Sequence, residues 1–295
     1  MSLIDSFNDG TSAITFPVRK FGKANPLKLC LISDIHLIAR SCNEDAVRRL
    51  LDRAVDEARR ILINGDLIDG IFPKDFKRYV PSVVMAAMSG RDDLLNATVQ
   101  YAIDFLTPYK EYIDFIGVGN HELSVLQYHS YDVMRPICQG LSTTDHKVKQ
   151  GQYMGFLRYP LSATSTQVHN YDIYYTHGAG GASPVTKGMI EFNRILSGVQ
   201  NVNMVWAGHM HTTTWTAENR LSMNQVGEVK NTIVDAVRTA GFLGHKEGSY
   251  PARFGMRPQP LGGMMIDVKW GSIVRKGQPR REGVVSVECT PIIIR

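Results

Sequence analysis

The chain has 295 residues, with 43% hydrophobic, 9% aromatic and 21% charged side chains and a formal net charge of +5. This composition excludes disordered and fibrous proteins, and the length is sufficient to bury a sizeable core. No apolar run reaches the ~18 residues of a membrane-spanning helix and the first residues lack a secretory signal, so we expect no membrane association.

Five short apolar runs recur along the chain, and each is followed directly by side chains able to bind a metal. Near-continuous runs of this length are typical of strands buried on both faces, which predicts a mostly parallel sheet. The runs are residues 27–33 before Asp34 and His36, 59–64 before Asp66, 112–119 before Asn120 and His121, 170–176 before His177, and 201–208 before His209 and His211.

Helical periodicity lies between these runs. Asn43 is a candidate N-cap for a helix up to residue 58, and a second pattern covers 94–106. We expect inserts at about 70–112 and 123–170 to shape the pocket, the second with one strand at 153–160 among loops.

The segments after residue 177 predict one more helix and a second sheet. The helix is expected at 185–196, after a glycine-rich loop that either approaches a phosphate or forms a flexible turn. Short alternating runs predict strands of the second sheet at 231–238, 264–270 and 283–294.

The C-terminal region carries the whole charge imbalance, because residues 251–295 hold eight basic and three acidic side chains. Arg275, Lys276, Arg280 and Arg281 form a cluster able to contact a polyanion such as a nucleotide or nucleic acid. A solvated hairpin face is the alternative, and the pattern slightly favours it.

The polar side chains that follow the strands predict one shared site. In open parallel sheets, ligands bind beyond the carboxyl ends of the strands. Asp34 and His36 are two residues apart, so an extended strand would project both to one face, and the same holds for His209 and His211. Carboxylates with imidazoles favour Mn, Fe, Zn, Co or Ni over Mg or Ca. Each motif alone also fits a core histidine or a turn.

The motifs D-x-H, GD-x-x-D, GNHE, H-G and GH-x-H resemble, in this order, those of the calcineurin-like metallophosphoesterases. They lie at residues 34–36, 65–69, 119–122, 177–178 and 208–211. The resemblance covers residues 30–211. It implies an α/β fold, a four-layer α/β/β/α sandwich with two central mixed sheets, and a dinuclear centre with two divalent metal ions per chain.

The resemblance also implies a role for each site residue. A first ion would be bound by Asp34, His36, Asp66 and His211. A second would be bound by Asn120, His177 and His209, with Asp66 bridging the two. His121 matches the catalytic histidine of the family, which binds no metal, and Asp69 matches its partner. The alternative for His121 is that it only supports the metal-binding loop.

The expected activity is hydrolysis of phosphate esters. Two divalent ions outweigh the charges of Asp34, Asp66 and a shared hydroxide, so an anionic phosphate ester is attracted. The ions would activate the attacking water. His121 would stabilise or protonate the leaving group, and Asp69 would orient its ring.

The substrate class follows from a departure from the family pattern. Protein phosphatases of this superfamily carry an arginine where this chain has Gly70, which disfavours a phosphoprotein. Together with the basic C-terminal region, this favours a phosphodiester. Residues 250–262 also resemble C-terminal parts of phosphoesterases from phages and prophages. Within them, Arg253 and Arg257 are candidate phosphate contacts, with packing and solubility as alternatives.

Two other functions stay open. A nuclease acting on DNA or RNA needs basic and aromatic side chains along a groove, and the C-terminal region offers only Phe254 and Trp270. An inactive protein-binding scaffold would be expected to lack ligands, whereas here all the motif positions are filled.

Domain organisation and compartment follow from composition. No linker divides the chain, so we expect a single domain at residues 27–295 after an N-terminal extension at residues 1–26. Four cysteines show no CxxC spacing, and Cys30 lies in an apolar run that suits a buried thiol. Such thiols predict a reducing cytoplasm. The sequence indicates no oligomeric state.

Overall fold

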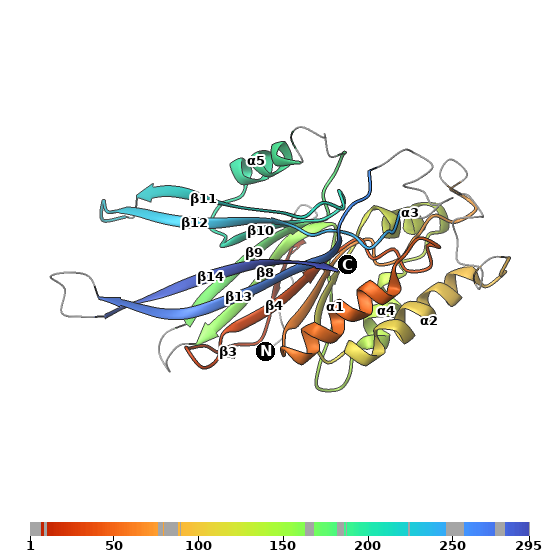
Figure 1. Ribbon diagram of the computed structural model, residues 1–295, viewed down its shortest axis with the longest axis horizontal. Helices are drawn as coiled ribbons and strands as arrows, with labels where there is room; N and C mark the ends of the chain where they lie inside the picture. Colours follow the sequence, from red (N-terminus) through yellow and green to blue (C-terminus); the bar gives the residue numbers. More distant parts are fainter. Residues whose placement is uncertain are drawn as a thin grey trace.

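Two β-sheets pack face to face and carry helices on both outer sides (Figure 1). This arrangement in the computed structural model confirms the predicted mixed α/β fold with two central sheets. The structure describes residues 7–8, 11–75, 79, 88, 90–162, 168–181, 186, 188–223, 225–245, 257–274 and 281–294.

The six-stranded sheet has the order β14-β13-β4-β5-β6-β7. Its parallel strands are β4 (Leu27–Ile32), β5 (Arg60–Asn64), β6 (Ile113–Gly117) and β7 (Lys149–Gln150). An antiparallel hairpin extends it beyond β4, formed by β13 (Leu261–Val274) and β14 (Arg281–Ile294).

The eight-stranded sheet has the order β1-β2-β8-β9-β10-β12-β11, and β3 also pairs with β8. Its N-terminal strands are β1 (Phe7–Asn8), β2 (Thr11–Thr15) and β3 (Arg19–Lys20). The others are β8 (Met154–Ser162), β9 (Val168–Thr176), β10 (Met204–Ala207), β11 (Thr214–Met223) and β12 (Val229–Arg238).

The helices divide between the two outer faces. One layer contains α1 (Glu44–Asp56), α2 (Leu94–Leu106), the 3-10 turn η3 (Thr107–Tyr109) and α4 (Met134–Leu141). The opposite face of the sandwich is covered by α5 (Met189–Gly198), through Phe192 and Leu196. A further helix, α3 (Asn120–His129), begins shortly after β6, which ends at Gly117.

Burial on both faces explains the apolar runs. In β4, Leu29 and Leu31 point into the core between the sheets, while Cys30 and Ile32 point under the helices. Successive side chains of a strand face opposite sides, so a strand between two packed layers needs apolar residues at every position.

The five predicted strands before the polar motifs are confirmed, but they belong to two sheets. Three, β4, β5 and β6, lie in the six-stranded sheet, whereas β9 and β10 are parallel neighbours in the other. The prediction that 231–238, 264–270 and 283–294 share a second sheet was wrong. The first lies beside β10 in the eight-stranded sheet. The other two belong to the six-stranded sheet, where β13 pairs antiparallel with β4 and β14 pairs with β13 at the edge.

The predicted helices at 44–58 and 94–106 are confirmed, and the side chain of Asn43 accepts the backbone N–H of Ala46 as an N-cap. Residues 123–141 were expected as loops and instead contain most of α3 and all of α4. The helix expected at 185–196 is found at 189–198, while residues 182–185 and 187 lie outside the described chain.

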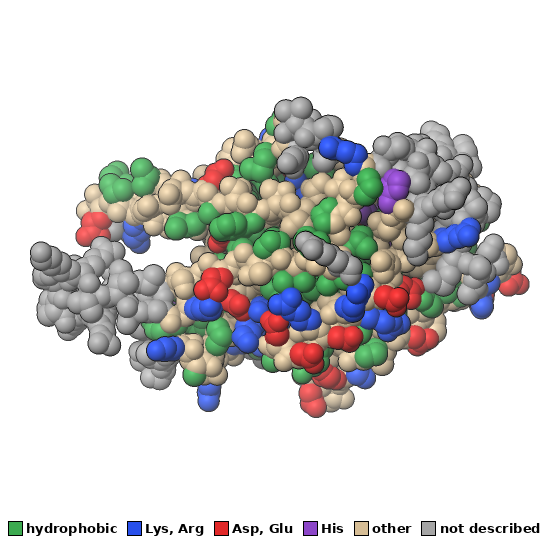
Figure 2. All heavy atoms as spheres, viewed as in Figure 1, with side chains coloured by type: hydrophobic (Ala, Val, Ile, Leu, Met, Phe, Trp, Pro, Cys, Tyr) green, Lys and Arg blue, Asp and Glu red, His purple; other side chains and the backbone are tan. Residues whose placement is uncertain are grey.

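The N-terminal residues contribute to the eight-stranded sheet, because β2 pairs in parallel with β8. The division at residue 27 and the pocket-shaping inserts stay predictions. Of the basic cluster, Arg275, Lys276 and Arg280 lie outside the described residues, as does Arg253. Lys and Arg alternate with Asp and Glu over the helical layer on the face in Figure 2. Within the described chain, no helix is long and apolar enough to cross a membrane.

Candidate metal centre

The carboxyl ends of β4, β5, β6, β9 and β10 meet where the two sheets adjoin. Between the loops that follow β4 and β5 of the six-stranded sheet, the backbone N–H of His36 donates to the carbonyl of Asp66 at 2.9 Å. Between the loops that follow β9 and β10 of the eight-stranded sheet, the N–H of Gly208 donates to the carbonyl of His177 at 3.0 Å. The side chain of Asn64 joins the sheets by donating to the carbonyl of Thr176 at 2.8 Å. All nine predicted site residues lie at these strand ends.

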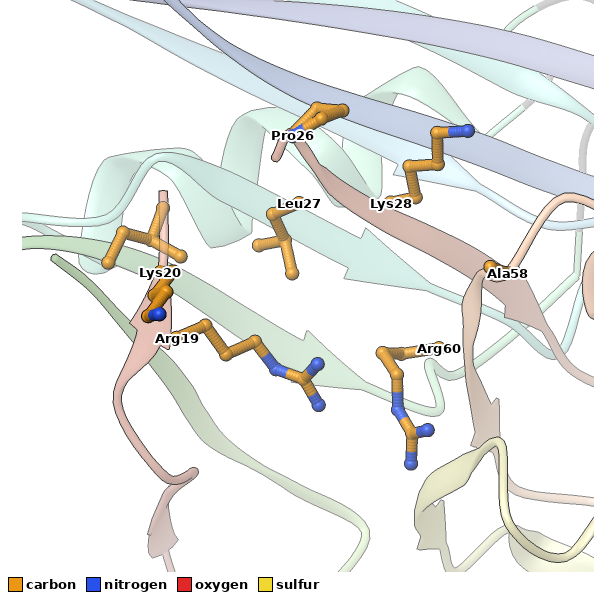
Figure 3. A pocket seen from close by; sticks show the side chains of 8 residues that line it. Arg19, Lys20, Pro26, Leu27, Lys28, Ala58 and Arg60 are labelled. Atoms are coloured by element: carbon orange, nitrogen blue, oxygen red, sulfur yellow. The ribbon is translucent and has the colours of Figure 1, made fainter. Parts of the chain in front are cut away.

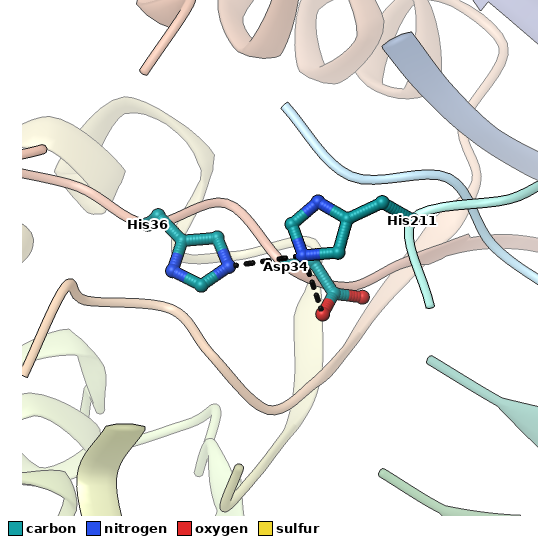
Figure 4. Close-up of side chains that lie close together, drawn as sticks. All are labelled: Asp34, His36 and His211. Carbon is teal, nitrogen blue, oxygen red and sulfur yellow. Dashed lines mark hydrogen bonds and ion pairs between the residues drawn. The ribbon is translucent and has the colours of Figure 1, made fainter. Parts of the chain in front are cut away.

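The first donor cluster consists of Asp34, His36 and His211 (Figure 4). Nε2 of His36 lies 3.4 Å from Nε2 of His211, which in turn lies 3.5 Å from Oδ1 of Asp34. Asp34 is fully buried, and its carboxylate accepts the backbone N–H of His209 and the hydroxyl of Ser33. The cluster is therefore a fixed set of donor atoms.

The second cluster consists of Asp66, His177 and His209, with Asn120 beside it. Nε2 of His177 lies 3.1 Å from Oδ2 of Asp66 and 3.2 Å from Oδ1 of Asn120. Nδ1 of the same ring lies 2.9 Å from the carbonyl oxygen of Asn64. A proton on Nδ1 satisfies that carbonyl and leaves Nε2 as a lone pair that faces two oxygen acceptors.

Asp66 lies between the clusters. Its Oδ2 is 3.1 Å from Nε2 of His177 and 3.8 Å from Nε2 of His36. Burial by itself would raise the pKa of this carboxyl, but the facing His177, His121 and His36 hold the pKa well below its usual range. Asp66 is thus an anion that both clusters share.

These donors fit divalent metal ions. Lone pairs of buried oxygen and imidazole nitrogen atoms converge, and such an arrangement needs a cation between them. A proton is the alternative cation. Burial lowers the pKa of His177, but Asp66, by its charge and its hydrogen bond, raises it to about 10. A metal ion must displace that proton, as is usual when histidine becomes a ligand.

His121 lies next to the clusters and makes an ion pair with Asp69. Its Nδ1 lies 2.9 Å from Oδ1 of Asp69, and its Nε2 lies 3.9 Å from Oδ2 of Asp66. Burial lowers the pKa of this ring, but the charge of Asp66 and the contact with Asp69 raise it to about 9. Nearby divalent cations would lower this pKa again. With its side chain 14% exposed, His121 is accessible from outside the site.

A comparison with protein families shows the family to which the chain belongs. A model described as calcineurin-like phosphoesterase matches residues 27–213, well over half of the chain. The chain belongs to the calcineurin-like phosphoesterase family. A comparison with curated proteins finds no match.

Membership of the calcineurin-like phosphoesterases supports a metal-dependent phosphoesterase, and this family depends on a dinuclear metal centre. The matched range contains both donor clusters, together with His121 and Asp69. It ends before β11, β12, β13 and β14, which complete the two sheets in this calcineurin-like phosphoesterase.

Glu122 is a structural residue of the site that sequence reasoning did not assign. Its buried carboxylate accepts the backbone N–H groups of Asp66 at 3.0 Å, Ile68 at 3.1 Å and Gly119 at 2.8 Å. It therefore links the loop after β5 to the start of α3. The signal was present, because an acidic residue three positions after a helix N-cap often accepts the N-cap N–H.

Tyr153 is a second missed residue. Its ring packs edge-on against His177 with centroids 5.5 Å apart, and its hydroxyl donates to the carbonyl of Gly178. On the other side of this loop, Oε1 of Glu191 accepts the N–H of Ala179 at 3.0 Å, and its other oxygen pairs with buried Arg238. Gly178 and Ala179, which begin the glycine-rich loop, are therefore held from both sides.

Gly70 lies against the backbone of His121. A Cβ atom at this position would come within 2.3 Å of the carbonyl oxygen of His121 and 2.8 Å of a methyl group of Val125. Any side chain would therefore push α3 away. The close contact therefore accounts for a glycine at position 70.

Proposed function

We propose that this protein is a phosphodiesterase that uses two divalent metal ions and acts on nucleotides or nucleic acid. The observation that carries the proposal is the position of Asp66, 3.1 Å from His177 and 3.8 Å from His36. A carboxylate shared by two ions needs to face both sets of ligands. Asp66 does so, and it is 2% exposed.

Each cluster has the donors for one ion. The first ion would be held by Asp34, His36, Asp66 and His211, and the second by Asp66, Asn120, His177 and His209. When bound, such a pair of ions supplies an activated water as nucleophile and neutralises phosphate oxygens. Manganese is our first choice because the donors are nitrogen and oxygen, and Fe, Zn, Ni and Co fit the same ligands.

The charge of the donor set favours an anionic substrate. Asp34 and Asp66 are the two carboxylates of the clusters. Asn120, the proposed ligand beside them, has an amide side chain and adds no charge. Two divalent ions with two carboxylates leave an excess of positive charge. That excess attracts the phosphate group of an ester.

His121 is the proposed proton donor. Because Nδ1 is engaged by Asp69, Nε2 is the ring atom that can donate to the leaving oxygen. The contact with Asp69 fixes the plane of the ring and favours its cationic form. A protonated Nε2 is positioned to stabilise the charge that develops as the ester bond breaks.

A diester substrate is supported by the absence of an arginine at position 70, where a Cβ atom would displace the backbone of His121. The basic composition of residues 251–295 supports a nucleotide or nucleic acid. We also propose a cytoplasmic location, supported by four free cysteines, of which Cys30, Cys42 and Cys138 are buried.

The test is a substrate panel with manganese-loaded protein. It contains bis-p-nitrophenyl phosphate, p-nitrophenyl phosphate, cyclic nucleotides and short single-stranded DNA and RNA. We expect diester turnover to exceed monoester turnover, and Asp66→Asn to abolish both. Dominant monoester turnover would overturn the diester assignment and leave a phosphomonoesterase.

The same preparation separates the alternative functions. A nuclease would cleave the single strands faster than the small diesters and would bind them with a steep dependence on salt. An inactive scaffold would hold less than one metal ion per chain after manganese loading and would turn over nothing.

A further inference from the structure

A polar cavity lies at the starts of β4 and β5, the ends of these two strands that point away from the metal centre. Its volume is about 260 Å³, and it opens between β3, the starts of β4 and β5 and the end of β8. Lys28 is the second residue of β4 and Arg60 the first of β5, whereas Asp34 and Asp66 follow the other ends. At ~3.3 Å per residue, Lys28 and Asp34 lie up to roughly 20 Å apart.

Cations dominate the wall of this cavity. Four of its eight lining residues are basic and none is acidic, the basic ones being Arg19, Lys20, Lys28 and Arg60. Figure 3 shows the guanidinium groups of Arg19 and Arg60 approaching the same space from β3 and β5. Like charges at such proximity repel one another, so the cavity is suited to an anion.

One buried carboxylate balances only part of this charge. Asp114 lies behind the two arginines, with Oδ1 2.8 Å from Nε of Arg60 and Oδ2 3.4 Å from Nη2 of Arg19. It also accepts the hydroxyl of Tyr159 at 3.0 Å. The four lining cations and this one carboxylate have a formal net charge of +3, and Nζ of Lys28 also donates to the carbonyl of Glu57 at 3.4 Å.

Arg60 makes more hydrogen bonds within the protein than Arg19 does. Arg60 donates to Asp114 and to the carbonyl of Glu111, so it is fixed in place. Arg19 makes a long contact with Asp114 and lies over the ring of Tyr159 at 5.9 Å from its centroid, and its buried Nε has no hydrogen-bond partner among the described residues. Its side chain is 37% exposed and can therefore turn toward a ligand.

We propose that this basic cavity is a second phosphate-binding site, separate from the metal centre, for inorganic phosphates or the terminal phosphates of a nucleotide. Guanidinium and ammonium donors suit phosphate oxygens. The wall contains no aromatic residue to stack on a base, so the phosphate groups supply the recognition. The site does not depend on the proposed activity.

The test is isothermal titration calorimetry of the full chain with imidodiphosphate, an analogue of pyrophosphate that resists hydrolysis. The titration is run on manganese-loaded protein and again after removal of metal by a chelator. The variants are Arg19→Gln and Lys20→Gln. The control is Lys23→Gln, an exposed lysine near this end of the chain that does not line the cavity.

We expect binding that persists without metal and weakens about tenfold in each cavity variant, as loss of one charge-assisted contact requires. Lys23→Gln should bind as the unaltered chain does. If Arg19→Gln fails to fold, as judged by its melting curve, Lys20→Gln decides, because Lys20 is exposed.

Equal affinity of the cavity variants and the control would overturn the proposal. So would binding that disappears with the metal, because the ligand would then be at the metal centre. A parallel titration with adenylyl imidodiphosphate identifies the source of the phosphate. Tighter binding than imidodiphosphate supports a nucleotide, and equal binding supports a free phosphate.

Discussion

Five of the seven proposed metal ligands have a left-handed backbone conformation. Asp34, His36, Asp66, His209 and His211 have φ values between 49° and 68°. Such conformations cost about 1 to 3 kcal/mol each in residues other than glycine, and they persist where surrounding contacts hold them. Here the contacts are backbone hydrogen bonds between neighbouring loops. For example, the N–H of Asp34 donates to the carbonyl of Gly65 at 3.1 Å.

This conformation corrects the sequence argument for the paired ligands. Asp34 and His36 were expected on one face because strand side chains alternate, but β4 ends at Ile32. The chain then turns at each ligand, and so it does at His209 and His211 after β10. The order of the motifs predicted that these residues lie together at the strand ends, while their positive φ values could not be predicted from it.

His121 and Asp69 can be separated from metal binding by substitution. We expect His121→Asn to lower kcat by about 10² to 10⁴ because the proposed proton donor is lost. Asp69→Asn should lower kcat less, because the ring stays in place with a weaker partner. Metal content, measured by mass spectrometry of the purified protein, should remain that of the unaltered chain in both. Loss of a metal ion in His121→Asn would instead make this residue a ligand.

Glu122 should be needed for stability. In Glu122→Gln, an amide N–H₂ replaces an oxygen that accepts backbone N–H groups, so donors face donors in a buried position. We expect the free energy of unfolding to fall by about 2 kcal/mol, measured by urea denaturation. The control is Glu111→Gln, an exposed carboxylate on the loop before β6. Equal stability of the two variants would contradict this role.

At the scale of elements, burial determined what the sequence could predict. The strands β4, β5, β6 and β10 are buried along almost their whole length and produce clear apolar runs, whereas β9 alternates buried with half-buried residues toward its end. By contrast, β11 alternates half-buried and exposed residues in an edge strand, so it gives no such run. The sheet to which β13 belongs depends on its pairing with β4, more than 200 residues earlier, which local patterns do not contain.

The helices after β6 were missed for a related reason. The first turn of α3 is part of the motif at residues 119–122. Its residues are polar because they belong to the site, so they do not show the apolar periodicity of a helix. The eight-residue α4 contains Pro136 and Gly140, which are typical of turns. Its buried side chains Met134, Ile137, Cys138 and Leu141 have helical spacing, but they cover only two turns, which is a short signal beside a proline and a glycine.

The contact between Gly70 and α3 gives a prediction for this element. In Gly70→Ala the new methyl group meets the carbonyl of His121, which is backbone and must move. We expect a loss of about 1 to 3 kcal/mol in stability and a lower kcat, because His121 shifts with the start of α3. The control is Gly22→Ala, where a Cβ meets nothing within 4 Å. An unchanged kcat would show that His121 tolerates the shift.

At the scale of the whole molecule, the site lies where polar side chains of the two sheets contact one another. Apolar contacts between the sheets include Leu31 and Leu62 from one and Trp206 from the other. At the metal centre, the contacts are polar instead. Asp34 and Asp66 come from the six-stranded sheet, and His177 and His209 come from the eight-stranded one. Ions at these positions would therefore connect the sheets.

Metal binding should consequently stabilise the entire fold. At a manganese concentration 100 times the dissociation constant, a single site adds about 2.7 kcal/mol to the free energy of unfolding. For a chain of this size we expect the melting temperature to rise by about 5 °C relative to chelator-treated protein, measured by calorimetry. In Asp66→Asn the shift should be largely lost, because the carboxylate that faces both clusters is gone. A shift of the same size in that variant would show that manganese binds elsewhere, and the two sheets would then not be joined through Asp66.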